Sequence, residues 1–134
     1  MSYVVLSMKF EPSIFELARV VVALYAEQES VAMQAPVSLS MAFRLAIYRG
    51  LAIYETLNPC VTQIDATLSK RNAGRGAKLD ESWEKRTLNL TPSMLERAAR
   101  VGLHRDESRS FALRHLVSLG LPVLVFEARR GVLL

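Results

Sequence analysis

The stretch LTPSMLE at residues 90–96 is the main evidence for the fold of this chain, because its pattern of residue types occurs twice. An earlier stretch, FEPSIFE at residues 10–16, has proline, serine and glutamate at the same places, and apolar residues match apolar residues between the two. In both stretches a proline opens a predicted helix, and Ser-x-x-Glu is the pattern of a capping box. One such helix start is common, so a second match is needed to establish a repeat.

The second match lies in the helix predicted to follow each of these starts. The segment SLSMAFRLAIYRGL (residues 38–51) aligns with SRSFALRHLVSLGL (residues 108–121), and the two share their serines, an alanine, an arginine and the final Gly-Leu pair. The first copy is longer between its proline and this arginine, which places the extra residues in the loop between its helices. Two matches in the same order indicate that one structural unit occurs twice.

Each copy begins with alternating apolar and polar residues. The period of two in YVVLSMKF (residues 3–10) and KRTLNL (residues 85–90) predicts two half-buried strands. The side chains expected to face the core are Leu6, Met8, Phe10, Leu88 and Leu90. A lone strand cannot satisfy its ladder hydrogen bonds, and one such unit buries too little apolar surface to fold well. We therefore predict a mainly α fold in which the strands pair as a short two-stranded antiparallel ribbon and four helices enclose one core.

The rest of the chain divides where its composition changes. The predicted segments are a first strand-helix-helix unit at residues 1–59, a basic connector at 60–84, a second unit at 85–122 and an apolar C-terminal tail at 123–134. Gly120 and Pro122 predict the end of the last helix, and the tail beyond them is expected to be extended or a strand.

Composition limits the classes of function. Of the 134 residues, 51% are hydrophobic and 22% are charged, so a compact folded protein is expected. The single cysteine, Cys60, excludes an internal disulfide and a cysteine-rich zinc site. The sequence contains no catalytic constellation, no metal-ligand pattern and no cofactor motif, which predicts a protein that is not an enzyme. It has neither a leader pattern nor an apolar run of membrane-spanning length, which predicts a cytoplasmic location and no membrane partner.

A short strand, a helix opened by proline and a second helix opening on Ser-x-Ser resemble the ribbon-helix-helix DNA-binding proteins of the Arc/MetJ superfamily. Residues 85–121 are the stronger match, and residues 3–57 are a looser one because their loop is longer and their strand and first helix are more apolar. Most members carry one copy and dimerise. Two copies in one chain resemble a fused pseudo-dimer, the tandem arrangement of TraY-like relaxosome proteins.

The resemblance implies that the outer face of the ribbon enters the major groove of duplex DNA. The residues that would then read base edges are Val5, Ser7 and Lys9 of the first strand and Lys85, Thr87 and Asn89 of the second. Asparagine can pair with adenine, lysine can reach guanine, serine and threonine pair flexibly, and valine can contact a thymine methyl group. Because the two sets differ, the preferred half-sites are expected to be unequal.

The resemblance also implies phosphate contacts at the start of each second helix, where free N–H groups and the helix dipole favour an anion. The residues at these places are Ser38, Ser40, Ser108, Arg109 and Ser110. The connector supplies four further cations, Lys70, Arg71, Arg75 and Lys78. They form either a flexible arm on the phosphates or the minor groove, or only a soluble tether. The net charge of +4 permits nucleic-acid binding without requiring it.

The function expected from this resemblance is sequence-specific binding of double-stranded DNA, by a transcriptional regulator or by an accessory factor of a conjugative relaxosome. A narrower version has the first unit only complete the fold, because Val4, Val5 and Leu6 make a weak reading surface. The alternative is a protein-interaction module similar to ribbon-helix-helix antitoxins. In that case residues 123–134 would be an exposed edge for a protein partner or a second copy, unless they pack on the chain's own core.

Overall fold

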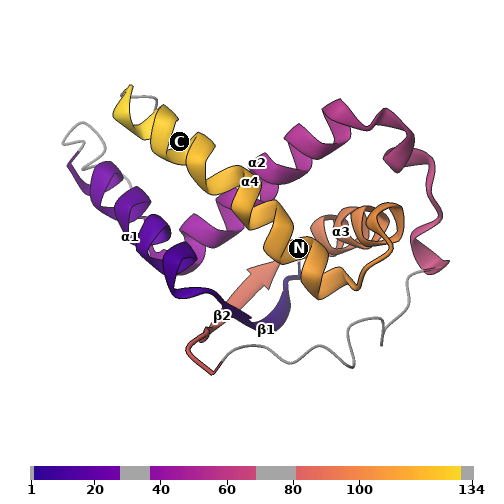
Figure 1. Ribbon diagram of the computed structural model, residues 1–134, viewed down its shortest axis with the longest axis horizontal. Coiled ribbons are helices and arrows are strands. Elements are labelled where there is room, and N and C mark those ends of the chain that lie inside the picture. The colour runs from indigo at the N-terminus through magenta and orange to yellow at the C-terminus, as the bar shows by residue number, and fades with distance from the viewer. Residues whose placement is uncertain (1, 28–36, 69–80, 131–134) are drawn as a thin grey trace.

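The computed structural model describes residues 2–27, 37–68 and 81–130 (Figure 1). The elements in chain order are β1 (Val4–Phe10), α1 (Pro12–Ala26), α2 (Leu39–Leu57), the short 3₁₀ helices η2 (Pro59–Gln63) and η3 (Ala66–Leu68), β2 (Glu84–Leu90), α3 (Pro92–Arg105) and α4 (Arg109–Arg129). The described chain is therefore mainly helical with one two-stranded antiparallel sheet, as predicted. A strand followed by two long helices occurs twice in this order.

The two strands pair antiparallel, and their predicted faces are confirmed. Leu6 lies opposite Leu88, and Ser7 lies opposite Thr87. Every position predicted to face the core is buried or half-buried, and every position predicted to face outward is exposed. The ribbon therefore closes the core with one face and leaves the other face open to solvent.

The helices surround one continuous core. α2 and α4 cross near the centre of the molecule, and α1 and α3 lie on opposite sides of this crossing (Figure 1). Next to β1 the core is aromatic: Phe10 stacks on Phe43 with ring centroids 4.5 Å apart, and Phe15 packs edge-on against both. Around the crossing it is aliphatic, with Ile47 and Leu116 fully buried. Side chains from both strand-helix-helix units thus share the same apolar interior.

Two glycines set how closely α2 and α4 approach. A Cβ atom added at Gly50 would overlap the carbonyl oxygen of Leu116, and one added at Gly120 would overlap the carbonyl oxygen of Ala46. In each case the atom in the way belongs to the backbone of the facing helix, so it cannot rotate aside. Gly120 is therefore a packing residue of the helix crossing rather than the helix end that the sequence predicted.

α4 continues past that predicted end. It runs through Pro122 to Arg129, so the expectation of an extended tail or strand is wrong for residues 123–129. Proline removes one helical hydrogen bond, here the bond to the carbonyl of Ser118. Ser118 and Pro122 are both exposed, so water can reach that carbonyl. Leu124, on the opposite side, is fully buried, and its burial favours continuing the helix.

The first helix of each unit begins differently from the predicted capping boxes. α1 begins at Pro12 with Glu11 as its N-cap and without a side-chain cap. α3 begins at Pro92, and the hydroxyl of its N-cap Thr91 accepts a hydrogen bond from the N–H of Met94 at 3.1 Å. Because proline takes the first helical position, the serine after it already lies inside the helix and does not cap it. The predicted Ser-x-x-Glu boxes are therefore wrong.

α4 is also long and apolar enough to cross a membrane by length and composition, with a mean hydropathy of 1.5 over its best window. Half of that window is buried within the fold, and α4 packs against α1, α2 and α3. The central helix of a soluble protein has the same properties, so this feature does not discriminate between the two environments.

Candidate nucleic-acid interface

Six side chains point outward from the ribbon, and all six are exposed. The register sorts them into three rows across the strands: Val5 with Asn89, Ser7 with Thr87, and Lys9 with Lys85. Residues directly opposite each other have Cβ atoms ~5 Å apart, so each row presents two side chains to the same part of a ligand. The sequence predicted these six residues, but the rows required the register.

The row of Lys9 and Lys85 places two ammonium groups side by side. Within the residues that the structure describes, neither lysine forms an ion pair with a carboxylate. Like charges directly opposite on an antiparallel pair destabilise it. An anion or a pair of hydrogen-bond acceptors against this row would remove that repulsion.

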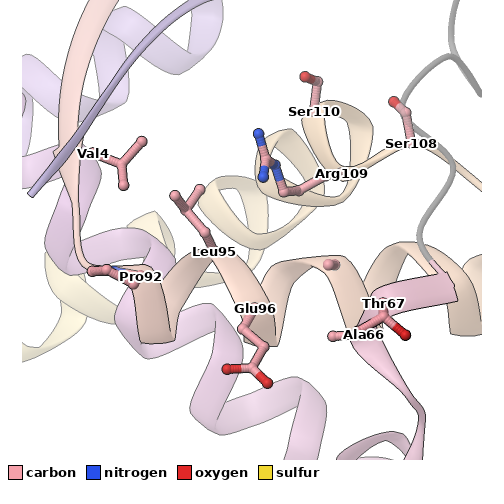
Figure 2. Close-up of a pocket in the computed structure, with 10 residues that line it drawn as sticks. Val4, Ala66, Thr67, Pro92, Leu95, Glu96, Ser108, Arg109 and Ser110 are labelled. Atoms are coloured by element: carbon pink, nitrogen blue, oxygen red, sulfur yellow. The ribbon is translucent and has the colours of Figure 1, made fainter.

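The start of α4 provides donors next to the ribbon. The hydroxyl of Ser108 accepts from the N–H of Phe111 at 3.3 Å, so it caps the helix and is itself buried. The N–H groups of Arg109 and Ser110 in the same turn have no intrahelical partner. The side chain of Arg109 extends from this turn toward Val4 of β1, over a pocket of about 790 Å³ (Figure 2). Backbone N–H donors, the helix dipole and the guanidinium of Arg109 therefore all favour an anion at the start of α4.

The start of α2 obtains its guanidinium from the other unit. Ser38 caps this helix, accepting from the N–H of Met41 at 3.1 Å, and is exposed. Ser40 accepts a hydrogen bond from Nε of Arg86 at 3.0 Å and donates one to the carbonyl of Thr87 at 3.3 Å. The alignment puts Leu39 where the second unit has Arg109, and Arg86 supplies the missing cation.

Sequence reasoning missed Arg86 as a functional residue. It lies on the core side of β2, opposite Met8, and is half-buried. An arginine at an inward position of a short amphipathic strand is a signal that could have been noticed. The sequence predicted Ser40 as a phosphate contact but not its hydrogen bond with Arg86, because that bond joins residues of different units.

Each end of the ribbon carries an arginine stacked on an aromatic ring. The guanidinium of Arg44 lies 5.6 Å from the ring centroid of Tyr3, and that of Arg114 lies 5.7 Å from the ring centroid of Trp83. Nε of Arg114 also donates to the carbonyl of Lys9 at 2.8 Å, which satisfies an edge group of β1. Burial lowers the pKa of Arg114 from its ordinary value. Sequence analysis noticed both arginines only as repeat matches.

The cations divide into two groups by location. Five described arginines form ion pairs with Glu84, Glu127, Glu55, Glu96 and Glu107. Of the described lysines and arginines without such a pair, two lie at the C-terminal end of α4, Arg129 and Arg130. The others are in the ribbon or on the first two turns of the second helices: Lys9, Lys85, Arg86, Arg44, Arg109 and Arg114. Most of the described lysines and arginines without an ion pair therefore lie in the ribbon or on the first two turns of α2 and α4.

A second group of titratable side chains joins α2, η2 and the end of α3. The hydroxyl of Tyr54 is 2.5 Å from Nδ1 of His104, and Sγ of Cys60 is 3.9 Å from Nε2 of the same ring. The ring of His115 packs edge-on against Tyr54, and burial together with the charge of Arg105 lowers the pKa of His115. The described residues contain no group of three side chains able to hold a metal ion.

The four connector cations, Lys70, Arg71, Arg75 and Lys78, lie outside the described residues, as do residues 131–134 of the tail. Comparisons with protein-family models, with curated proteins and with solved structures give no match for this chain, so its function has to be argued from the site itself.

Proposed function

We propose that this protein is a single-chain pair of ribbon-helix-helix units that binds duplex DNA sequence-specifically, with the β1–β2 ribbon in the major groove. A two-stranded ribbon fits that groove, which is ~12 Å wide. The protein acts as a transcriptional regulator or as an accessory factor of a DNA-processing complex of the relaxosome type, since both require the same groove contacts.

The observation that carries this proposal is the position of the unpaired cations. Two of them, Lys9 and Lys85, lie on the solvent-exposed ribbon face, whose side chains are of the types that read base edges, and four others lie in the ribbon or on the first two turns of the second helices. The arginines elsewhere are largely neutralised by glutamates. A phosphate backbone on either side of an inserted ribbon would supply the missing negative charge.

The ribbon register supports the pseudo-dimer. Counterparts in the two strand segments are 80 residues apart, as Pro12 and Pro92 are. Ser7 and Thr87 are counterparts by this spacing and also lie directly opposite each other. A two-fold axis through their row would therefore exchange the strands, which is the relation expected between the halves of a ribbon-helix-helix dimer.

The helix crossing supports the same relation. Gly50 and Gly120 are counterparts 70 residues apart, and so are Ala46 and Leu116. Gly50 faces the backbone of Leu116, and Gly120 faces the backbone of Ala46. Exchanging the two units therefore turns one contact into the other. The two arginine–aromatic pairs at the ribbon ends are related in this way as well.

A gel-shift series against random duplex pools tests the proposal. We expect retention of a defined sequence, with an affinity well above that for unselected duplex and with a steep loss of binding as salt rises. Failure to shift any duplex below about 1 μM protein at moderate salt, the range of non-specific binding, would contradict DNA binding as the function.

Ser38→Asp is expected to weaken DNA binding about 10-fold without unfolding the protein. Aspartate caps a helix as well as serine does, so the free energy of unfolding should change by no more than ~0.5 kcal/mol. Its charge would repel a phosphate at the start of α2. Ser38→Asn is the matched control, because asparagine is an equally good cap without charge. Equal binding by the two variants would argue against a phosphate at this helix start.

The alternative, a protein-interaction module, has less support. In the segment predicted to be a tail, Leu124 and Ala128 are buried in the chain's own core. Residues 123–129 are helical, so they offer no strand edge. Among residues 123–130, which the structure describes, the exposed side of α4 still offers a partner Phe126, which is 60% exposed beneath the guanidinium of Arg130. Absence of DNA binding in the gel-shift series would favour this alternative.

A further inference from the structure

The three rows of the ribbon differ in chemistry from one end to the other. The row of Val5 and Asn89 has no charge, whereas the row of Lys9 and Lys85 has two positive charges. The middle row, Ser7 and Thr87, consists of two hydroxyls. The axis through the middle row would relate Val5 to Lys85 and Lys9 to Asn89, and these counterparts are unlike. The two ends of the outer ribbon face therefore differ in chemistry, although the fold beneath them repeats.

We propose that the preferred DNA site is not a palindrome, and that it has adenine–thymine pairs at the end facing Val5 and Asn89 and guanine–cytosine pairs at the end facing Lys9 and Lys85. This inference rests on the proposed function, because it concerns which duplex the ribbon binds. It assigns a base composition and a direction to the site.

The uncharged row matches an adenine–thymine pair. An asparagine amide can bond bidentately to N6 and N7 of adenine, and a valine can contact the methyl group of the paired thymine. Both groups are available in one row, and Val5 is 65% exposed. At a guanine–cytosine pair the valine would find no methyl group, and the amide would lose the adenine pattern.

The doubly charged row matches guanine. Guanine presents two acceptors in the major groove, O6 and N7, whereas adenine and cytosine each present an amino group that would face an ammonium unfavourably. Two neighbouring ammonium groups call for several acceptors within a short distance, which guanines on adjacent pairs supply.

The spacing of the rows sets the distance between the two kinds of base pair. Val5 and Lys9 are four residues apart on β1. At ~3.3 Å per strand residue and ~3.4 Å per base pair, their rows lie about four base pairs apart along a groove that the ribbon follows. The expected site therefore has its adenine–thymine end and its guanine end separated by about four base pairs.

In-vitro selection with two symmetrised variants tests the inference. Lys9→Asn with Lys85→Val gives both ends the uncharged row, and Val5→Lys with Asn89→Lys gives both ends the charged row. All four positions are exposed, so both variants should keep the fold, which circular dichroism can verify. We expect the wild type to select a directional sequence, the first variant a palindrome with adenine–thymine ends, and the second a palindrome with guanine-bearing ends.

Single base-pair changes in the selected wild-type site give a second measurement. Exchanging the adenine–thymine end for guanine–cytosine should weaken wild-type binding about 10-fold or more and should have little effect on Asn89→Ala, which has lost that contact. A palindrome selected by the wild type, or one sequence selected by all three proteins, would overturn the inference and leave DNA binding intact. Recovery of no sequence by the wild type would instead contradict the proposed function.

Discussion

Gly120→Ala is expected to lower the free energy of unfolding by about 3 kcal/mol, at the upper end of the usual cost of overpacking. Alanine normally stabilises a helix by ~1 kcal/mol relative to glycine, so the local effect opposes this loss. The loss prevails because the new Cβ atom would overlap the backbone carbonyl of Ala46, and only separation of α2 from α4 can relieve that overlap. Urea unfolding followed by circular dichroism measures the difference.

Two comparisons make this result specific. Ser118→Ala is the control in the same helix, at an exposed position, and should change stability by no more than ~0.5 kcal/mol. Gly50→Ala should resemble Gly120→Ala, and the double variant should cost less than the sum of the two, because one separation of the helices relieves both overlaps. Full additivity, or a stabilising Gly120→Ala, would mean that the helices do not meet as described.

Lys9→Ala combined with Lys85→Ala is expected to raise the dissociation constant for DNA about 100-fold, if each lysine contributes ~1.4 kcal/mol at a base or phosphate. The same double variant should stabilise the free protein slightly, by about 0.2–1 kcal/mol, because it removes a like-charged cross-strand pair. A change that weakens binding while it stabilises the fold indicates residues kept for a ligand.

The matched control for the lysines is Arg129→Ala with Arg130→Ala. These arginines also have no ion pair within the described chain, and their removal changes the net charge equally. They lie at the end of α4 away from the ribbon, so binding should fall by no more than a few fold through the weaker overall field. Equal losses in both variants would show that total charge, rather than the ribbon, governs binding.

The sequence predicted the ribbon well because the alternation of residue types within a strand shows which side chains lie on each of its faces. Alternation in residues 3–10 and 85–90 fixed which side chains lie inward, and the repeat indicated that the strands pair. The six outward residues therefore follow from the sequence pattern alone. Their arrangement in rows depends on the register, which alternation alone does not determine.

The errors occurred where a local signal competes with a distant contact. Gly120 and Pro122 are ordinary helix-ending residues, yet burial of Leu124 keeps α4 helical beyond them. The sequence alone does not distinguish a glycine needed for close helix packing from a glycine that ends a helix. Arg86 was missed for a related reason, since its significance depends on Ser40, a residue of the other unit.

Pairing of β1 with β2 inside one chain also bears on how the protein is made. At ~5–20 residues per second, a ribosome needs about 4–16 s to synthesise the 80 residues between counterpart positions of the two strands. During those seconds β1 lacks the strand that pairs with it, whereas Phe10 already has its ring partners Phe15 and Phe43 in the same half. β1 therefore stays unpaired until β2 emerges, and because both strands belong to one chain their pairing does not depend on protein concentration.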